Sequence, residues 1–392
     1  MARCPATWQG AVNARMLSYW ESRSFHRTPD FVVIGCGIVG SFTALFHKRR
    51  FPHHHVVILE RGPFPIGASV KNAGFACFGS PSELLEDIAT EGKEIALGRV
   101  EERWRGLLEL RAELGDGPIG LELCGGHEVF RAHDPLYTRV AAGFDELNAS
   151  LLDLFGTDVY HWNDAAERFG LARGVRIAST DLEGAIDTGM MMSALLRKVR
   201  EAGVTIRTGA DVVALEETTD RITLVLADGT RMSAGHVVVA TNGFTKQLLP
   251  DVDVSPGRGQ VLITTPIAGL KLKGTFHLDA GYYYFRDVDG AVLLGGGRNL
   301  DPIGETTFED ATTPVIEQAL DRVLRELILP DREFRVAVRW SGVMGFGTRS
   351  KSPLVQRRSE RITLAVRLGG MGVAMGIRVA RKAAALASDG IA

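Results

Sequence analysis

The stretch Phe31-Val32-Val33-Ile34-Gly35-Cys36-Gly37-Ile38-Val39-Gly40 decides how the first part of this chain folds. Its four leading apolar residues are typical of a strand that is buried on both faces. Glycines follow at once, and a helical pattern continues to about Arg50. A second apolar run, Val56-Val57-Ile58-Leu59, ends at Glu60. The sequence therefore predicts a complete βαβ unit within about 30 residues.

The glycine pattern of this unit indicates a dinucleotide site. Gly35 permits a tight turn, Gly37 lets the backbone approach a pyrophosphate, and Gly40 lets the helix pack close to the strand. The start of the helix offers free N–H groups and the positive end of its dipole to phosphates. Glu60 is placed to accept hydrogen bonds from ribose hydroxyls, and its charge would repel the 2′-phosphate of NADP.

The rest of the chain distinguishes FAD from NAD. A simple NAD-binding protein would continue with regular βαβ units after residue 62. Instead, Gly62-Pro63-Phe64 leads into the loop 66–74 and then into a long helical segment. Much later, Ala240-Thr241-Asn242-Gly243 ends an apolar strand near the expected diphosphate. This order is typical of two-domain flavoproteins, so FAD is the expected cofactor.

Composition narrows the class of protein further. The 392 residues are too many for one ordinary core and suit two intertwined domains. A formal net charge of −2 gives no electrostatic reason to expect nucleic acid or an anionic membrane as a partner. We expect no transmembrane segment, because no apolar run reaches about 18 residues, and no export, because residues 1–13 lack an apolar signal core. The four cysteines, Cys4, Cys36, Cys77 and Cys124, do not have the paired spacing of zinc ligands, so we expect no metal. A reducing cytoplasm is the simplest location for such a protein.

Beyond residue 80 the hydrophobic periodicity changes several times. Helices are expected over 81–116, 190–202, 314–327 and 373–387. Strands are expected over 212–217, 222–227, 232–240, 261–266, 281–286, 291–294, 336–340 and 362–366. Asp228-Gly229 and Asp289-Gly290 mark hairpin turns between neighbouring strands.

Several separate motifs occur in a fixed order along the chain. They are the glycine loop with Glu60-Arg61, Gly67-Ala68-Ser69-Val70-Lys71-Asn72-Ala73-Gly74, Val212 in an adenine-side strand, Ala240-Thr241-Asn242-Gly243, Arg258-Gly259-Gln260 and Gly369-Gly370-Met371-Gly372. In this order they resemble the D-amino acid oxidase-like family of FAD-dependent oxidoreductases, which includes glycine and sarcosine oxidases. The resemblance covers the chain from about Leu17.

The resemblance implies an α/β fold, with a discontinuous Rossmann-like FAD-binding domain and an α+β substrate domain built on an antiparallel sheet. The implied FAD-binding domain comprises residues 1–80, 181–250 and 336–392, and the substrate-binding domain comprises 81–180 and 251–335. The loop 69–74 would lie along the flavin and pyrophosphate, and 370–374 beside the flavin's pyrimidine edge. The expected cofactor-binding residues are Gly35, Gly37, Ile38, Val39, Gly40, Glu60, Arg61, Ala68, Ser69, Lys71, Asn72, Ala73, Gly74, Val212, Thr241, Asn242, Gly243, Gly370, Met371, Gly372, Val373 and Ala374.

Three departures from the family pattern leave the substrate and the electron acceptor open. Sarcosine oxidase-like members carry a lysine near the position of Ala374. D-amino acid oxidase-like members place a substrate-binding arginine where Met344 aligns. No cysteine or histidine stands out for covalent flavin attachment, so we expect FAD to bind non-covalently.

A substrate carboxylate is usually gripped by a guanidinium and by tyrosine hydroxyls. In the strand 281–286, the period of two puts Tyr282, Tyr284 and Arg286 on one face. The neighbouring strand ends in Gly295-Gly296-Gly297-Arg298, where missing side chains leave room for flavin or substrate. We predict that Tyr284 and Arg298 contact the substrate. The alternatives are ordinary sheet packing for the tyrosine and a surface salt bridge for the arginine.

Other residues could supply the missing cation or a base. Arg349 and Lys351 follow the position of Met344 and are predicted to act from a shifted position, and Arg339 and Arg367 are further cationic candidates. His127 could reach the substrate as a base, although a histidine at a strand end is usually structural.

These observations predict an FAD-dependent amine or amino-acid oxidase or dehydrogenase. It would oxidise a C–N bond of an amino acid or secondary amine by hydride transfer to the flavin. The electron acceptor would be oxygen, or a quinone or electron-transfer protein. Two alternatives stay open: oxidation of a modified tRNA nucleoside, which the lack of a basic patch disfavours, and a non-catalytic flavoprotein subunit.

Overall fold

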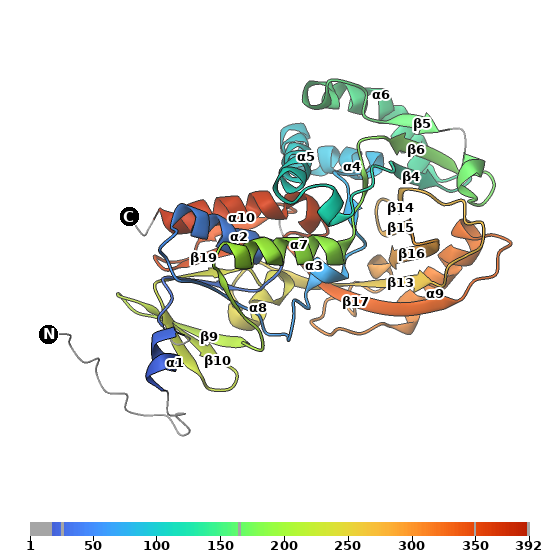
Figure 1. The fold of residues 1–392 in the computed structure, drawn as a ribbon. Helices are drawn as coiled ribbons and strands as arrows, with labels where there is room; N and C mark the ends of the chain where they lie inside the picture. The colour runs from blue at the N-terminus through green and yellow to red at the C-terminus, as the bar shows by residue number, and fades with distance from the viewer. Residues whose placement is uncertain (1–17, 25–26, 164–165, 349, 390–392) are drawn as a thin grey trace.

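A computed structural model describes residues 18–24, 27–163, 166–348 and 350–389 of the chain (Figure 1). Its first sheet has six strands, whose spatial order is β18 (Leu354–Arg357), β19 (Ile362–Val366), β12 (His236–Val239), β1 (Phe31–Ile34), β2 (Val56–Leu59) and β8 (Thr205–Arg207). All neighbours pair in parallel except β18, which is antiparallel to β19 at the edge. The predicted βαβ unit therefore lies at the centre of this sheet.

Alternate residues of the central strands face two different cores. Phe31 and Val33 pack with α2 (Ile38–Arg50), α5 (Lys93–Leu114), α7 (Thr188–Glu201) and α10 (Gly372–Ser388). Val32 and Ile34 pack against a three-stranded sheet formed by β9 (Val212–Glu217), β10 (Ile222–Leu226) and β11 (Arg231–Ala234). Burial on both faces explains why β1 is an uninterrupted apolar run.

The second large sheet has eight strands. Their spatial order is β17 (Val336–Phe346), β13 (Ser255–Thr264), β16 (Ala291–Gly296), β15 (Tyr283–Val288), β14 (Thr275–Leu278), β4 (Gly126–Phe130), β6 (Arg176–Thr180) and β5 (His161–Asn163). Every neighbouring pair is antiparallel except β14 and β4. One face packs on α9 (Pro314–Val323) and the following turn η5 (Leu324–Ile328). At the β4–β6 end, the other face is covered by α4 (Pro81–Glu91) and α6 (Pro135–Phe155).

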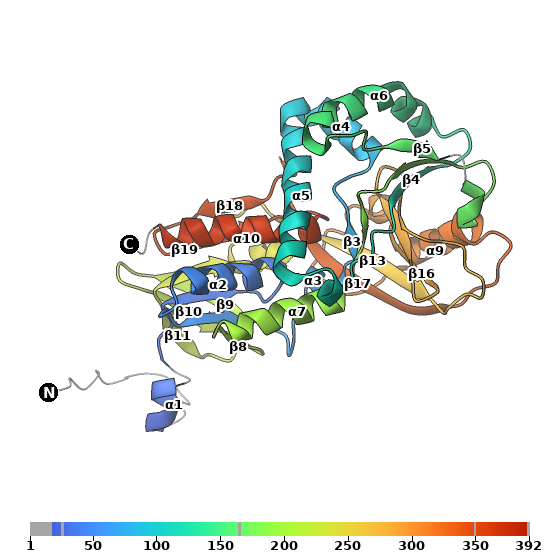
Figure 2. The ribbon, with the colours of Figure 1, turned by 45° about the horizontal axis from the view of Figure 1, so that its top comes forward.

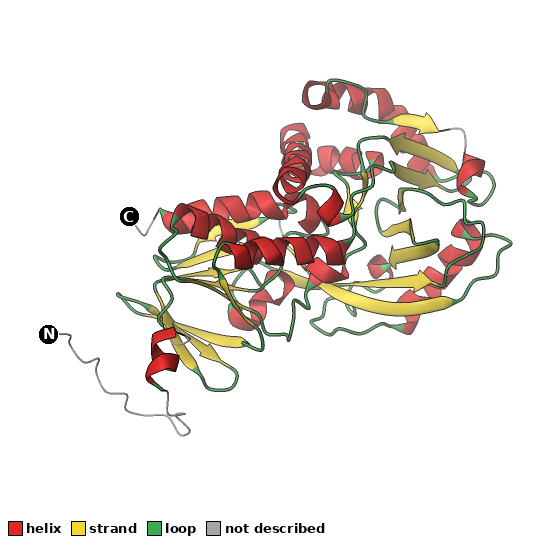
Figure 3. Cartoon of the chain, in the orientation of Figure 1, coloured by secondary structure: helices red, strands yellow, loops and turns green. Residues whose placement is uncertain are grey.

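Shorter elements complete the fold, and Figure 3 colours its helices, strands and loops by type. The shorter elements are α1 (Tyr19–Ser24), α3 (Ala68–Lys71), β3 (Phe75–Ala76), η1 (Gly117–Ile119), η2 (Ala166–Phe169), β7 (Gly184–Ala185), η3 (Asn242–Phe244), α8 (Thr245–Leu248) and η4 (Arg298–Leu300). Figure 2 shows α5 crossing the amino-terminal end of α10. No helix in the described ranges is long and apolar enough to cross a membrane.

The mixed α/β class and the combination of a Rossmann-like sheet with a largely antiparallel sheet are confirmed. The structure differs from the expected boundary at residue 336, because β17 belongs to the eight-stranded sheet. Antiparallel pairing along nearly the whole of β13, from Ser255↔Phe346 to Thr264↔Val336, holds it there. The chain returns to the six-stranded sheet only at β18 and β19. The expected strand 232–240 is also two strands, β11 and β12, which separate at Gly235 and enter different sheets.

Candidate active site

The carboxyl ends of the parallel strands lead into partly exposed loops. The strands β1, β12 and β19 are buried throughout, whereas Gly35, Gly37 and the turns around residues 240–242 and 367–372 are partly exposed. Ligands of open α/β sheets bind outside the carboxyl ends of the strands, so this edge is where a dinucleotide would lie.

The glycine loop has the geometry that a dinucleotide requires. Gly35 adopts a positive φ of +104°, and an added Cβ there would lie 2.8 Å from the carbonyl oxygen of Ala240. A Cβ on Gly40 would lie 1.9 Å from the Gly35 oxygen, so only glycine lets α2 begin against the turn. Gly37 caps α2 without a side chain, and the Ile38 N–H donates to Ser69 Oγ at 2.9 Å. The N–H groups of Val39 and Gly40 have no acceptor within the helix and suit a diphosphate.

Glu60 braces this loop from the end of β2. Its carboxylate is 6% exposed and accepts hydrogen bonds from the N–H of Cys36 (3.1 Å) and of Gly62 (3.0 Å). The main chain of Glu60 also accepts a bond from Ala210, which leads into β9 and the buried Val212. The predicted contacts of Glu60 with a ribose and of Val212 with an adenine stay predictions.

The predicted cofactor loop 68–74 is ordered by its own side chains. Asn72 Nδ2 donates to the carbonyls of Ala68 and Ser69 at 3.1 Å, and Asn72 Oδ1 accepts from the Gly74 N–H at 2.9 Å. Lys71 forms an ion pair with Asp310. These contacts orient the loop beside the glycine turn, to which Ser69 already ties it.

Two further predicted cofactor-binding residues, Arg61 and Asn242, are held by contacts between segments that are distant in sequence. Arg61 stacks on Phe244, with its guanidinium carbon 3.8 Å from the ring centroid. Asn242 Oδ1 accepts from the N–H groups of Arg367 (3.1 Å) and Leu368 (3.2 Å), joining the turn after β12 to the turn after β19. Asn242 thus positions two of the loops at the carboxyl ends of the strands.

The start of α10 lies directly after the turn that follows β19. Gly370 is exposed, with no atom within 4 Å of an added Cβ, and Met371 caps the helix without a side-chain hydrogen bond. Ala374 is 1% exposed, because α10 crosses α5 so closely that a Cβ on Gly106 would lie 1.8 Å from the Ala374 oxygen. Ala374, where the family resemblance implies a lysine, therefore lies at a crossing of two helices. The glycine cradle and the helix starts without side-chain caps fit FAD.

Strand β17 brings the eight-stranded sheet against these loops. A Cβ on Gly243 would lie 2.4 Å from the oxygen of Met344, and one on Gly342 would lie 3.1 Å from Lys71 Cβ. Trp340 Nε1 donates to the Lys71 carbonyl at 2.9 Å. The sheet face that carries Met344 is thereby placed beside the cofactor loop.

Tyr284 lies on this face of the sheet, half-buried on β15. Its register neighbours are His277 and Gly295, and Phe75 meets its ring edge-on at 5.9 Å between centroids. An added Cβ on Gly295 would lie 2.4 Å from Tyr284 Cε2, so this glycine provides the space that the ring occupies. Burial raises the pKa of Tyr284 to about 12, although the charge of Arg298 acts in the opposite direction. The hydroxyl is therefore a neutral donor at physiological pH.

Arg298 begins η4, directly after Gly297 in a left-handed conformation with φ of +77°. Its guanidinium carbon lies 4.2 Å from the ring centroid of Phe346, on the face of β17 that also carries Met344. Within the described ranges, no carboxylate forms an ion pair with Arg298. The structure therefore does not show the surface salt bridge that was the alternative prediction for Arg298. The guanidinium of Arg298, close to Tyr284, is available to an anionic group.

The remaining candidates have other surroundings. Lys351 forms an ion pair with Asp87 on α4, a carboxylate 1% exposed that also pairs with Arg99 at 2.6 Å. The prediction that Lys351 supplies the free cation is weakened by this pairing, and Arg349 lies outside the described residues. Two further cations are paired, Arg339 with Asp321 (2.7 Å) and Arg367 with Asp253 (3.0 Å).

His127 lies on the opposite face of the sheet from Tyr284. It packs against the rings of Phe169 and Phe276 in the core under α9, and its Nδ1 lies 2.8 Å from Ser179 Oγ. Burial lowers its pKa to about 4. His127 therefore has a structural role in the core and does not face the substrate side as a base.

Two residues near Tyr284 were not predicted from the sequence. Phe75 meets both Tyr284 and His277 edge-on, the latter at 5.3 Å between centroids. Burial lowers the pKa of His277, which keeps the imidazole neutral. Phe75 could have been predicted from its position directly after the cofactor loop. His277 could have been predicted from the pairing of β14 with β15, in which it lies opposite Tyr284.

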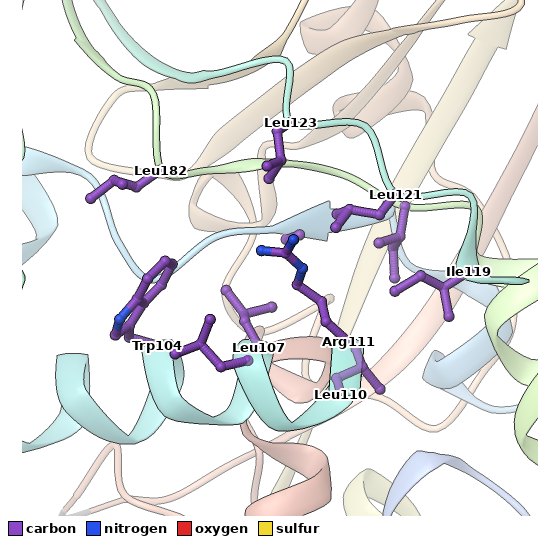
Figure 4. A pocket seen from close by; sticks show the side chains of 11 residues that line it. Trp104, Leu107, Leu110, Arg111, Ile119, Leu121, Leu123 and Leu182 are labelled. Carbon is purple, nitrogen blue, oxygen red and sulfur yellow. The ribbon is translucent and has the colours of Figure 1, made fainter. Parts of the chain in front are cut away.

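A separate apolar pocket lies between α5 and the segment around residues 119–123 (Figure 4). Its walls include Trp104, Leu107, Leu121 and Leu182. Its one charged lining residue, Arg111, is already bonded to Asp116 through Nε and Nη2, each at 2.9 Å. The residues that line this pocket offer no acid, no base and no unpaired cation.

Comparisons with known proteins define the class of this flavin-binding fold. Residues 30–386 match the FAD dependent oxidoreductase (DAO) family. The chain belongs to this family, and FAD is its cofactor. The bifunctional protein ThiO/ThiG of a Synechocystis species is 32% identical over 255 residues, which are 62% of this chain and 34% of that protein. The match thus spans about a third of the relative's length.

Solved structures share the fold over nearly the whole chain. L-proline dehydrogenase from P. horikoshii has a TM-score of 0.73 at 18% identity, covering 93% of this chain and 94% of that one. Iminodiacetate oxidase from a Chelativorans species has a TM-score of 0.72 at 19% identity, covering 92% and 95%. Glycine oxidase from Bacillus cereus has a TM-score of 0.71 at 18% identity, covering 92% and 95%. The chain is thus an FAD-dependent oxidoreductase by family and by fold.

Proposed function

We propose that this oxidoreductase oxidises the C–N bond of an amino acid or secondary amine that carries a carboxylate. The observation that carries the proposal is Arg298, a half-buried cation near Tyr284 that no described carboxylate neutralises. A desolvated guanidinium is a strong partner for a substrate carboxylate. The structural neighbours named for glycine, proline and iminodiacetate support the same class of substrate.

The residues of the chain would bind and orient such a substrate. Arg298 would hold the carboxylate, and the neutral hydroxyl of Tyr284 would donate a hydrogen bond to it. Phe75, Met344 and Phe346 form apolar surface beside these groups and would exclude water. FAD, when bound, accepts a hydride from the substrate carbon that bears the nitrogen. The protein's contribution is therefore positioning and desolvation.

We also propose that FAD is held without a covalent bond and passes its electrons to oxygen, or to a quinone or electron-transfer protein. Burial raises the pKa of the Cys36 thiol, within the glycine loop, to about 11, which leaves the thiol protonated and a poor nucleophile. Cys36, Cys77 and Cys124 are free thiols, which supports a cytoplasmic location.

Anaerobic bleaching of the bound flavin tests the substrate class. Purified protein is mixed without oxygen with D-, L- and N-methyl amino acids, and with matched amines that lack the carboxylate. We expect a subset of the carboxylates to remove the flavin's visible absorbance, and the matched amines to act far more slowly. If only plain amines bleach the flavin, the substrate carries no carboxylate. If no compound of either kind does, a nucleoside substrate or a non-catalytic role replaces this proposal.

A further inference from the structure

Arg286 is a half-buried cation whose hydrogen bonds go to main-chain oxygens. It lies on β15, two residues after Tyr284 and on the same face of the strand. Its Nη1 donates to the carbonyls of Gly74 (2.9 Å), Ile186 (2.9 Å) and Ala73 (3.4 Å). Its Nε donates to the carbonyl of Asp287 at 3.1 Å. The guanidinium is thus fixed in orientation from two sides.

These bonds join three segments that are distant in sequence. Ala73 and Gly74 end the cofactor loop, Ile186 follows β7, and Arg286 itself belongs to the eight-stranded sheet. Gly74 has a φ of +73°, and an added Cβ would lie 2.7 Å from Arg286 Nη1 and 2.3 Å from the Ile186 oxygen. The Ile186 N–H also donates to the Gly74 carbonyl at 2.8 Å. The end of the loop is therefore held where the guanidinium reaches three carbonyls at once.

The arrangement needs an arginine rather than any cation. Within the part of the chain that the structure describes, Arg286 makes no ion pair with a carboxylate. Burial lowers its pKa from the ordinary value, although nearby acidic groups oppose this effect. Carbonyl oxygens thus accept hydrogen bonds from Nε and Nη1 in place of water. A planar guanidinium directs several N–H groups at fixed angles, whereas a lysine ammonium is a point charge on a flexible stem.

We propose that Arg286 is a positioning residue that ties the end of the cofactor loop to the strand of Tyr284. Because Tyr284 and Arg286 are neighbours on one rigid strand, the clamp sets the separation between the bound cofactor and the substrate-contacting hydroxyl. The inference rests on the proposed function for its effect on catalysis, but its effect on FAD binding does not depend on the substrate.

The test compares Arg286→Met and Arg286→Lys with a matched control, Arg131→Met. Arg131 directly follows β4 of the same sheet and pairs with Asp279 on the protein surface. FAD affinity is measured by titrating deflavinated protein and following flavin fluorescence, and the visible spectrum of the bound flavin is recorded. We expect Arg286→Met to weaken FAD binding at least tenfold and to blur the flavin's vibrational fine structure. Arg286→Lys should recover part of the affinity, and Arg131→Met should behave as wild type.

Steady-state kinetics with a bleaching substrate provide the second measurement. A misplaced cofactor should lower kcat more than it changes KM in FAD-saturated Arg286→Met. If KM rises alone while FAD affinity is unchanged, Arg286 binds substrate and the positioning role is wrong. If both variants bind FAD with wild-type affinity and spectrum, the clamp has no function. Should Arg286→Met fail to fold, Arg286→Lys decides on the same two readouts. Should no amine reduce the flavin, the titration still decides about Arg286.

Discussion

Replacing Arg298 by alanine separates substrate binding from protein stability. The side chain stacks on Phe346 at 4.2 Å and has no carboxylate partner in the described ranges, so few contacts within the protein are lost. A partly exposed cation–π contact is worth about 0.5–1 kcal/mol, which lowers Tm by at most about 3 °C. Removing the partner of a buried substrate carboxylate costs about 3–5 kcal/mol.

The kinetic effect of Arg298→Ala should therefore be much larger than its effect on stability. A cost of 3–5 kcal/mol corresponds to about two to four orders of magnitude in kcat/KM, and the half-burial of Arg298 favours the lower end. The assay is anaerobic flavin reduction by the best carboxylate substrate and by its matched amine. The amine should lose little, because it has no carboxylate for the arginine to hold.

Arg325→Ala is the matched control for this substitution. Arg325 also stacks on an aromatic ring, Phe334 at 4.8 Å, but it lies on η5 behind α9 and should leave kcat/KM unchanged. The reasoning is refuted if Arg298→Ala reduces flavin at the wild-type rate, or if it slows the carboxylate and the matched amine equally. In the first case the carboxylate is held elsewhere, and Arg349 becomes the next residue to replace.

Three further expectations concern the cofactor site and the protein's pH dependence. Gly37→Val should abolish retention of flavin after gel filtration, since an added Cβ would lie 2.8 Å from Ser69 Oγ and obstruct the phosphate cradle; a folded, fully yellow variant would contradict this. Asp310→Asn should tighten FAD binding about two- to fivefold at low salt, because it frees Lys71 for the diphosphate and removes a charge that repels it. Such a contribution corresponds to about 0.5–1 kcal/mol. Unchanged affinity in a fluorescence titration would argue against this expectation. Burial raises the pKa of Glu128 to about 7, above an unfolded value of about 4.3, so its contribution to stability is complete below about pH 4 and is lost as pH rises through 7. Between pH 5 and pH 8, the free energy of unfolding of Glu128→Gln, measured with urea, should therefore rise by up to about 3 kcal/mol relative to that of the wild type. A difference between the two proteins that does not change with pH would show that the carboxyl does not titrate in this range.

Much of the fold could be predicted because its signals are local. The strand, glycine turn and helix over 31–50 are adjacent in sequence, and their burial and φ angles follow from the residue types present. The period of two placed Tyr284 and Arg286 on one face of a strand, opposite the face that Tyr283 presents to the core under α9. The boundary near residue 336 could not be predicted in this way, because a strand's own pattern does not say which sheet will accept its hydrogen bonds.

The sequence by itself determined the dinucleotide-binding unit, the order of the family's motifs and the choice of FAD. Only the tertiary structure decided which cations remain available for a substrate. Lys351 and Arg298 are alike as isolated residues, but Asp87 on a distant helix neutralises the first, whereas an aromatic ring lies under the second. Arg286 likewise meets three carbonyls of segments far away in the chain. Charge pairing depends on distances of a few ångströms between elements that only packing brings together, and no local pattern encodes those distances.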